Sequence, residues 1–255
     1  MSEFEFPSDL LHRLREAHHV VVLTGAGISA ESGIPTFREA QTGLWARYDP
    51  QELASPQALA HHPELVWQWY AWRRDLVRRA QPNPGHLALA ALEKMVPRFT
   101  LITQNVDGLH QRAGSQEVVE LHGNIMRTVC AANRHLVTEW ASPPEGEAPR
   151  CPICGSVLRP DVVFFGEPLP PQALQTATAA VQTADVMLVV GTSGAVYPAA
   201  ALPEIAKTHG AYVVEINPLP TPLSSLADVI LRLPAGKALP ALLAAAWPEH
   251  TPERL

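Results

Sequence analysis

The sequence has few cysteines and lacks long apolar runs. Its three cysteines are an odd number, so we expect a reducing compartment, the cytoplasm, and no disulfide framework. Asp185 interrupts the best apolar stretch before it reaches the about 18 residues that a membrane span needs, so no membrane association is expected. The N-terminal segment has early acidic residues and no apolar core of the signal-peptide kind.

Positive charge is also scarce. The formal net charge is −6, and charged residues make up 17% of the chain. This balance argues against a nucleic-acid partner held by phosphate neutralisation, although it leaves a basic protein segment open as a partner. With 47% hydrophobic residues in 255, the chain is able to bury a core as one large domain, with or without a small insert.

Short β-branched runs alternate with segments rich in alanine and leucine. The expected strands lie in 19–27, 98–105, 184–193, 211–217 and 227–233, and the expected helices in 86–95, 171–182 and 200–210. Near-continuous apolar strands between helices are typical of a parallel sheet covered on both faces, an α/β fold. Each strand ends in polar or glycine residues, and in such sheets these ends meet at the ligand-binding edge.

Two segments depart from this alternation. Residues 36–80 contain an aromatic helix candidate at 66–79, and residues 123–160 are rich in proline, glycine and cysteine. We interpret them as two inserts that form a smaller lobe over the sheet edge. The larger domain would then consist of 1–35, 81–122 and 161–255.

A glycine-rich loop follows the first expected strand. Residues 25–30, GAGISA, satisfy the pattern GxGxxG/A, whose glycines permit a tight turn and close approach to a pyrophosphate at a helix N-terminus. An ordinary strand-to-helix turn is the alternative. A dehydrogenase also needs an acidic residue at the end of a second strand about 20 positions on. Asp49 is near that distance, but its surroundings are not strand-like, which disfavours hydride transfer.

Seven motifs occur in the order found in one family. They are GAGISAESGIPTFR (25–38), TQNVDGLHQRAG (103–114), ELHGN (120–124), a cysteine module (130–154), DVVFFGE (161–167), GTS (191–193) and INPLPTP (216–222). Over nearly its whole length the chain resembles the sirtuins, which are NAD-dependent protein-lysine deacylases. The resemblance implies a Rossmann-like parallel sheet, with a smaller lobe made of a helical module and a cysteine, zinc-ribbon-like module. It also implies NAD as co-substrate and acyl-lysine proteins as partners.

The resemblance assigns the catalytic and cofactor positions. His122 matches the general base that deprotonates a ribose hydroxyl, a task that suits an imidazole with an unperturbed pKa near ~6.5. From spacing alone, His122 is one of eleven histidines, most of which we expect to be surface or capping residues. The matching cofactor positions are Gly25, Ala26, Gly27, Ser29, Phe37, Arg38, Gln104, Asn105, Asp107, Gly191, Thr192, Ser193, Asn217 and Ala238. Turn and cap roles are the alternative for the asparagine and aspartate positions.

A further segment matches the place where an extended substrate peptide adds as a strand. Its residues are Val163, Phe164, Phe165, Gly166 and Glu167. Backbone pairing of this kind gives affinity without strict sequence demands. An ordinary buried strand is the alternative, and the sequence does not separate the two.

The aromatic helix candidate bears on which acyl group the protein removes. Tyr70 and Arg73 are three residues apart, so they share one helix face, and they match sirtuins that prefer succinyl and malonyl groups. Ala54 matches the small residue that leaves room for the longer chain. The alternative is a solvated basic face made of Arg73, Arg74, Arg78 and Arg79 beside packing tryptophans.

The cysteine module is one ligand short of the family's zinc site. Cys151 and Cys154 form an intact pair, but the partner of Cys130 is Asn133, and an amide is a poor zinc ligand. His135 is close enough in sequence to be a fourth ligand. Alternatively, the metal is lost and packing holds the module together.

Several functions remain open on the sequence. The favoured one is lysine deacylation with an acidic-acyl preference and weaker deacetylation. The alternatives are deacetylation without that preference, ADP-ribosyl transfer or NAD hydrolysis at the same site, and an NAD-sensing module without catalysis. The oligomeric state is open, with a monomer favoured.

Overall fold

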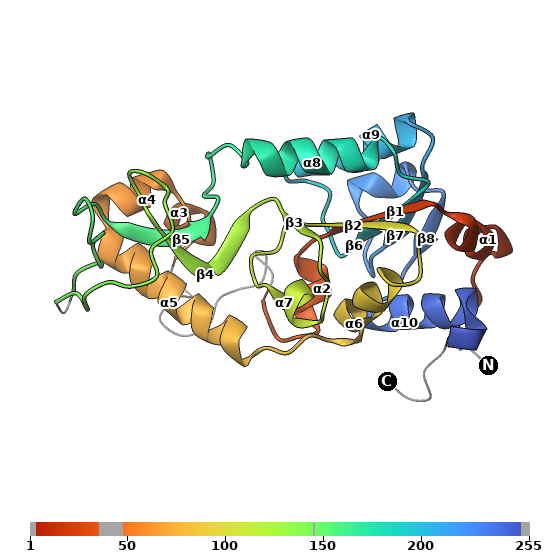
Figure 1. Cartoon of the computed structure of the whole chain (residues 1–255), viewed down its shortest axis with the longest axis horizontal. Helices are drawn as coiled ribbons and strands as arrows, with labels where there is room; N and C mark the ends of the chain where they lie inside the picture. The colour runs from red at the N-terminus through yellow and green to blue at the C-terminus, as the bar shows by residue number, and fades with distance from the viewer. Residues whose placement is uncertain (1–3, 36–47, 145, 251–255) are drawn as a thin grey trace.

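A six-stranded parallel sheet forms the centre of the larger part of the computed structural model, which describes residues 4–35, 48–144 and 146–250 (Figure 1). Its order is β3-β2-β1-β6-β7-β8, and every neighbouring pair is parallel. The strands are β1 (His19–Thr24), β2 (Arg98–Thr103), β3 (Val118–Glu120), β6 (Val186–Val190), β7 (Tyr212–Ile216) and β8 (Val229–Leu231). The predicted parallel sheet is confirmed, although β3 was not expected.

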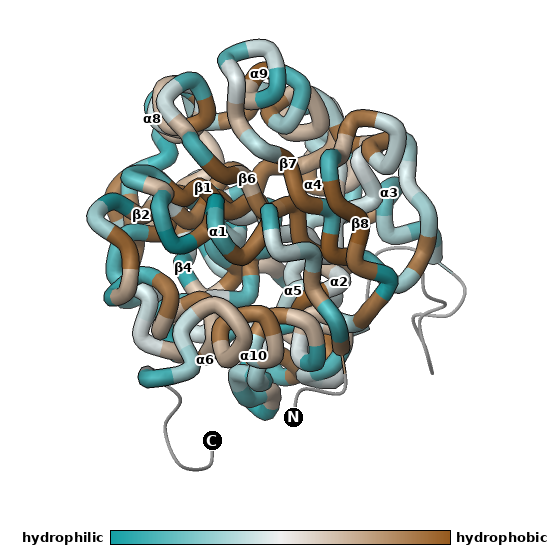
Figure 2. The backbone as a smooth tube through the Cα atoms, turned by 90° about the vertical axis from the view of Figure 1, so that its right-hand side faces the viewer, coloured by the Kyte–Doolittle hydropathy of each residue, from teal (hydrophilic) through white to brown (hydrophobic). Residues whose placement is uncertain are grey.

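Helices cover both faces of this sheet. On one face pack α1 (Ser8–Glu16), α2 (Ala26–Ala30), α6 (Pro84–Leu92) and α10 (Ala235–Ala246), and on the other α8 (Pro171–Val181) and α9 (Leu202–Thr208). Alternate β1 side chains enter the two cores: Val20 and Val22 join the first, Val21 and Leu23 the second. In Figure 2 the central strands β6 and β7 are brown, as expected of a doubly covered sheet.

The smaller part of the molecule joins two distant segments of the chain (Figure 1). Its helices are α3 (Pro50–Leu53), α4 (Pro56–His61) and α5 (Pro63–Arg79), and its strands are β4 (Gly123–Cys130) and β5 (Leu158–Val162). The two strands form a separate antiparallel sheet. The sequence predicted the helical module but not this sheet, and the predicted boundary at 160 falls inside β5.

Arg74 fastens the helical module to the small sheet. The β4–β5 register shifts between Asn124 and Thr128, so the intervening carbonyls leave the ladder. Arg74 Nε donates to the Ile125 carbonyl (2.6 Å), and an Nη2 hydrogen reaches the Arg127 carbonyl (2.9 Å). Arg74 is therefore a buried structural residue, so the alternative that placed it on a solvated basic face is wrong for this residue.

Short elements complete the described chain. They are α7 (Leu109–Arg112) and the 3-10 turns η2 (Ala199–Ala201), η3 (Pro222–Ser225) and η4 (Pro248–His250). Within the described residues, none of the helices combines the length and the apolar character that crossing a membrane requires.

Candidate functional site

The strand order reverses between β1 and β6, and two glycine segments touch at that point. The chain adds β2 and β3 on one side of β1 and β6, β7 and β8 on the other. The Gly25 N–H donates to the Val190 carbonyl (3.0 Å), and the Gly27 N–H donates to the Gly191 carbonyl (2.8 Å). A crevice at such a reversal is the usual ligand site of open α/β sheets.

The loop glycines are required by packing. Neither Gly25 nor Gly27 has a positive φ. A Cβ on Gly25 would lie 2.7 Å from the Thr192 Cα, and one on Gly27 would lie 2.7 Å from the Gly191 Cα. Gly191 has a φ of 60°. The two glycines therefore allow the β1 loop and the β6 loop to pack closely against each other, and α2 is a five-residue helix.

Polar residues from β2, β6 and β7 converge beside this loop, as predicted. Gln104 Nε2 donates to Thr192 Oγ1 (2.9 Å), and Asn217 Nδ2 donates to the Thr192 carbonyl (2.9 Å). Ser193 follows in the same loop and is partly exposed. Strand ends far apart in sequence thereby form one hydrogen-bonded rim.

A series of buried polar side chains, linked by hydrogen bonds, lies next to the rim. Asn105 Nδ2 donates to the Gly25 carbonyl (3.0 Å) and to Ser29 Oγ (3.2 Å), and the Ser29 hydroxyl donates to Asp107 Oδ2 (2.7 Å). Asp107 Oδ1 accepts the Leu109 N–H (2.8 Å), which closes a local turn directly before α7. Burial raises the pKa of Asp107, against the opposing effect of these two hydrogen bonds.

Two histidines extend this series, and sequence reasoning missed both. The Thr24 hydroxyl donates to Thr103 Oγ1 (2.8 Å), so it accepts from His110 Nε2 (2.9 Å). His110 Nδ1 is buried and has no hydrogen-bond partner among the described residues. The His86 ring centroid lies 4.9 Å from that of His110. Burial lowers the pKa of His110 to about 3, with His86 adding to the effect, and that of His86 to about 4.

Sequence signals for these two histidines existed. His110 directly follows the Asp107 turn, and His86 stands at the third helical position after Asn83. The Asn83 side chain accepts hydrogen bonds from two backbone N–H groups, and the backbone N–H of Asn83 donates to His86 Nδ1 (3.3 Å). This is a capping box with histidine in the role usually taken by glutamate or glutamine.

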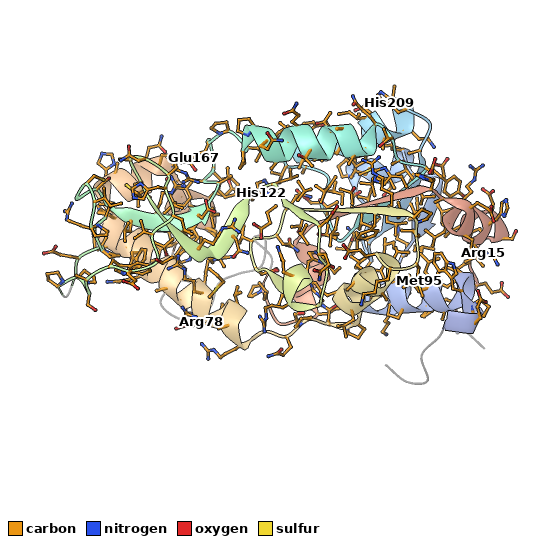
Figure 3. All side chains as sticks on the ribbon, viewed as in Figure 1. Arg15, Arg78, Met95, His122, Glu167 and His209 are labelled. Carbon is orange, nitrogen blue, oxygen red and sulfur yellow. The ribbon has the colours of Figure 1, made fainter. Side chains whose placement is uncertain are left out.

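His122 lies at the junction between the two parts of the molecule (Figure 3). Its Nδ1 is 2.8 Å from the Gln104 carbonyl. A carbonyl only accepts, so Nδ1 carries the hydrogen and Nε2 is the basic nitrogen. The His122 carbonyl accepts the Val163 N–H (3.0 Å). Burial lowers the pKa of His122 despite the opposing hydrogen bond, so the ring is neutral at pH 7.

The glycine after His122 permits this junction. Gly123 has a φ of 79°, and a Cβ there would lie 2.1 Å from the Asp161 carbonyl oxygen. No side chain fits between β4 and β5 at this position. Gly123 therefore fixes the distance between the imidazole and the small sheet.

The predicted peptide segment is a loop rather than a strand. β5 ends at Val162, and the Phe165 N–H donates to the Ala54 carbonyl (2.8 Å). Glu167 accepts from the Phe164 N–H (2.8 Å) and from both Arg159 Nη atoms (2.6 and 2.7 Å). Although burial opposes it, the Arg159 guanidinium lowers the pKa of Glu167. The alternative of an ordinary buried strand is therefore wrong.

The predicted acyl-pocket residues lie against this loop. The Tyr70 ring stacks on Phe164 with centroids 5.7 Å apart, and Ala54 belongs to the same hydrophobic cluster. Tyr70 is 2% exposed, and its hydroxyl has no hydrogen-bond partner among the described residues. Burial raises the pKa of Tyr70 and lowers that of Arg73, whose guanidinium lies 5.0 Å from the Trp69 ring centroid.

One predicted cofactor position lies in the core rather than at this rim, and two others are not described by the structure. Phe37 and Arg38 lie outside the described residues. Ala238 is fully buried in α10 among core residues. Its assignment to the cofactor stays a prediction.

The three cysteines form a cluster in the small sheet module. Their sulfurs lie within 4.8 Å of one another. Cys130 Sγ is 3.5 Å from Cys154 Sγ, and His135 Nε2 is 3.4 Å from Cys151 Sγ. Three thiols at this spacing could hold a zinc ion.

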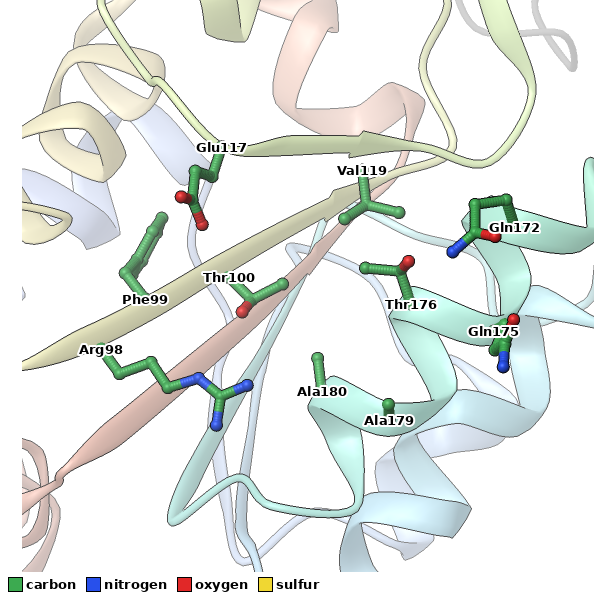
Figure 4. A pocket seen from close by; sticks show the side chains of 10 residues that line it. All are labelled: Arg98, Phe99, Thr100, Glu117, Val119, Gln172, Gln175, Thr176, Ala179 and Ala180. Carbon is green, nitrogen blue, oxygen red and sulfur yellow. The ribbon is translucent and has the colours of Figure 1, made fainter.

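A separate cavity of about 400 Å³ lies between β2, β3 and α8 (Figure 4). Its lining residues are Arg98, Phe99, Thr100, Glu117, Val119, Gln172, Gln175, Thr176, Ala179 and Ala180. None of them belongs to the rim, to the histidine network or to the acyl-pocket residues. We therefore assign this cavity no part in the candidate site.

Comparisons with known proteins cover nearly the whole chain. Residues 25–198 match the model of the Sir2 family. An NAD-dependent protein deacylase of Ralstonia nicotianae is 52% identical over 248 residues, covering 96% of this chain and 98% of that protein. One from Thermus thermophilus is 54% identical over 237 residues, covering 91% of each.

Solved structures show the same fold. A Sir2 homologue in complex with NAD has a TM-score of 0.90 and 48% identity, covering 98% of this chain and 97% of that chain. A complex of Sir2 with a p53 peptide and NAD+ has a TM-score of 0.84 and 35% identity, covering 94% and 98%.

Proposed function

This chain belongs to the Sir2 family of NAD-dependent protein deacylases, and from that premise we propose that it removes succinyl and malonyl groups from lysine side chains in preference to acetyl groups. The products would be nicotinamide, an O-acyl-ADP-ribose and free lysine. The observation that carries the acyl preference is the buried Tyr70 hydroxyl, which has no hydrogen-bond partner within the described part of the chain. One helical turn away stands Arg73.

We assign NAD to the rim between β1 and β6. Support comes from the donors and acceptors there, since Gln104, Asn105 and Asn217 offer amides of the kind that ribose hydroxyls and a carboxamide require. Bound NAD supplies an electrophilic ribose carbon when nicotinamide leaves. Holding both reactants beside one another accounts for much of the rate in such reactions.

In this proposal His122 acts as the general base through Nε2. Its Nδ1–H bond to the Gln104 carbonyl fixes the tautomer and orients the ring. Its lowered pKa keeps the nitrogen unprotonated at neutral pH. A base so placed contributes about 10²–10⁴-fold in rate.

The peptide would lie along the loop at 163–167. The N–H groups of Val163 and Phe165 already bond to His122 and Ala54. The Phe164 N–H is also bonded, to Glu167 (2.8 Å), so a peptide would pair with backbone carbonyls of this loop rather than with these three N–H groups. Gly166, which is exposed and has open space around its Cα, suits such an approach.

The acyl preference follows from the cost of burying a lone hydroxyl. A buried polar group without a partner costs about 1–3 kcal/mol, which a bound carboxylate would recover. Tyr70 and Arg73 together supply an O–H donor and a guanidinium, the strong partners of a carboxylate. Ala54 keeps this place uncrowded because its side chain is a single methyl group.

The test compares kcat/KM on succinyl-, malonyl- and acetyl-lysine versions of one peptide, measured by nicotinamide release. Arg73→Met should lower the succinyl value about 10- to 100-fold, the range expected for a lost charged hydrogen bond, and spare or raise the acetyl value. Tyr70→Phe should shift the ratio in the same direction without disturbing the stack on Phe164.

Arg78→Met is the matched control, because Arg78 is on the same helix and exposed, in an ion pair with Asp75 (2.6 Å). It should leave all three substrates unchanged. Equal losses on succinyl and acetyl peptides in Arg73→Met would refute the acyl assignment and leave a general deacylase. Nicotinamide release without any acyl peptide would favour ADP-ribosyl transfer or NAD hydrolysis. The cytoplasmic location and the monomeric state stay predictions.

A further inference from the structure

Two turns of the same form lie in the cysteine module. In the first, the Arg134 N–H donates to the Cys130 carbonyl (2.9 Å), and the Cys130 N–H donates to the His135 carbonyl (3.0 Å). In the second, the Gly155 N–H donates to the Cys151 carbonyl (2.9 Å), and the Cys151 N–H donates to the Ser156 carbonyl (2.7 Å). The sequence offsets of the two pairs of bonds are identical.

The backbone confirms this equivalence. The fifth residue of each turn is left-handed: Arg134 has a φ of 57° and Gly155 a φ of 73°. Asn133 therefore occupies in the first turn the place that Cys154 has in the second. His135, two residues after Asn133, occupies in the first turn the position that Ser156 has in the second.

The first turn keeps this form at a cost. A left-handed arginine costs roughly 1–2 kcal/mol relative to the usual conformation. Its side chain is held by Asp161 at 3.3 Å. The first turn thus has the backbone form of the Cys151–Cys154 turn although its fourth residue is Asn133, so a metal ion here needs its fourth ligand from another residue.

The sulfur positions suit a tetrahedral ion. A zinc ion with bonds of about 2.3 Å to sulfur sets neighbouring sulfurs about 3.8 Å apart. Cys130 and Cys154 have Sγ atoms 3.5 Å apart, and the Cys151 sulfur completes a group within 4.8 Å. The three sulfurs are thus close to the positions that three ligands of a tetrahedral zinc ion would take.

Two side chains are candidates for the fourth ligand position. Asn133 Nδ2 lies 3.7 Å from Cys154 Sγ, but an amide is a poor zinc ligand. His135 Nε2 lies 3.4 Å from Cys151 Sγ, close to the about 3.5 Å expected between a nitrogen and a sulfur ligand of one zinc ion. The imidazole is the better ligand, and the amide N–H is the better donor to a thiolate.

We propose that this module holds one Zn²⁺ through Cys130, Cys151, Cys154 and His135, while Asn133 donates a hydrogen bond to the Cys154 thiolate. The imidazole lies beside Cys151 and outside the group that the three sulfurs form. It turns toward the other two sulfurs when the ion binds. Binding releases three thiol protons, and the amide hydrogen bond offsets part of the excess negative charge.

The experiment uses the full chain with Co²⁺ as an optical probe and zinc content as a second readout. Visible absorption reports tetrahedral geometry and thiolate ligation, and X-ray absorption of the zinc form should give three sulfurs near ~2.3 Å and one nitrogen near ~2.0 Å. Chelator competition measures affinity. His135→Ala should lower zinc affinity about 100-fold or more, the share of one ligand among four, and Asn133→Ala about 10-fold.

A compensating variant keeps the test decisive if His135→Ala folds poorly. Asn133→Cys in the His135→Ala background places a thiol at the vacant corner, so it should restore tetrahedral zinc with four sulfurs. Wild-type chain without zinc would overturn the proposal. So would zinc with four sulfurs or oxygen ligands in the wild type, or a larger affinity loss in Asn133→Ala than in His135→Ala. None of these readouts depends on deacylase activity.

Discussion

Replacing Arg74 by methionine should separate structural from functional arginines on α5. Arg74 is 7% exposed, and its guanidinium bonds to the Ile125 and Arg127 carbonyls (2.6 and 2.9 Å) and to Thr128 Oγ1 (2.9 Å). Burial lowers its pKa to about 10, with Arg78 adding to the effect, and the side chain stays cationic at neutral pH.

The expected loss follows from the acceptors left behind. Methionine fills much of the same volume but donates nothing, so two carbonyls in the irregular part of β4 lose their partner. Each buried acceptor without a partner costs about 1–3 kcal/mol. We therefore expect Arg74→Met to lower the free energy of unfolding by about 3 kcal/mol, or about 6–12 °C in Tm for a chain of this size.

The assay is urea unfolding followed by circular dichroism, with Tm as a second measure. Arg78→Met is the control, since its side chain is 59% exposed and bonds only to Asp75 in the described structure. It should change stability by less than about 0.5 kcal/mol. Equal unfolding midpoints for the two variants would refute the idea that Arg74 supports the irregular strand.

Three further outcomes follow from the site. Gly27→Ala should destabilise the fold by about 1–3 kcal/mol, because its Cβ would lie 2.7 Å from the Gly191 backbone. An unchanged Tm would contradict this and would mean that the β6 loop moves to make room for the methyl group. Acidification below about pH 6.5 should lower the urea midpoint. The unfolded chain then protonates its histidines, while His86 and His110 stay neutral in the fold to about pH 4 and 3. Above pH 6.5 both states are neutral and this effect vanishes, so a midpoint that rose on acidification would contradict the burial argument. His122→Asn should lower kcat about 10²–10⁴-fold while NAD binding, followed by calorimetry, persists.

Much of the fold was predictable because strand and helix periodicity is local. The five predicted strands correspond to β1, β2, β6, β7 and β8, and α8 begins at the predicted residue 171. β3 was missed because it has only three residues. β4 and β5 were missed because their register shifts, and Pro160 interrupts the alternation.

The arrangement of the candidate site was predictable only in part. The polar strand ends meet as expected at one edge, since parallel strands place all their carboxyl ends together. The role of the loop glycines was not predictable, because it depends on how near Gly191 passes. The same holds for Asp107, whose two oxygens accept the Leu109 N–H and the Ser29 hydroxyl at once.

By itself, the sequence determined the family and the parallel sheet, because motif order and apolar periodicity are properties of the linear chain. Only the tertiary structure decided what each polar side chain does. Arg73 and Arg74 are neighbours in sequence, yet helical geometry places the guanidinium of Arg73 over the Trp69 ring and that of Arg74 in the gap of β4. Burial and partners set the protonation of His86, His110 and His122, and both are products of contacts between distant segments.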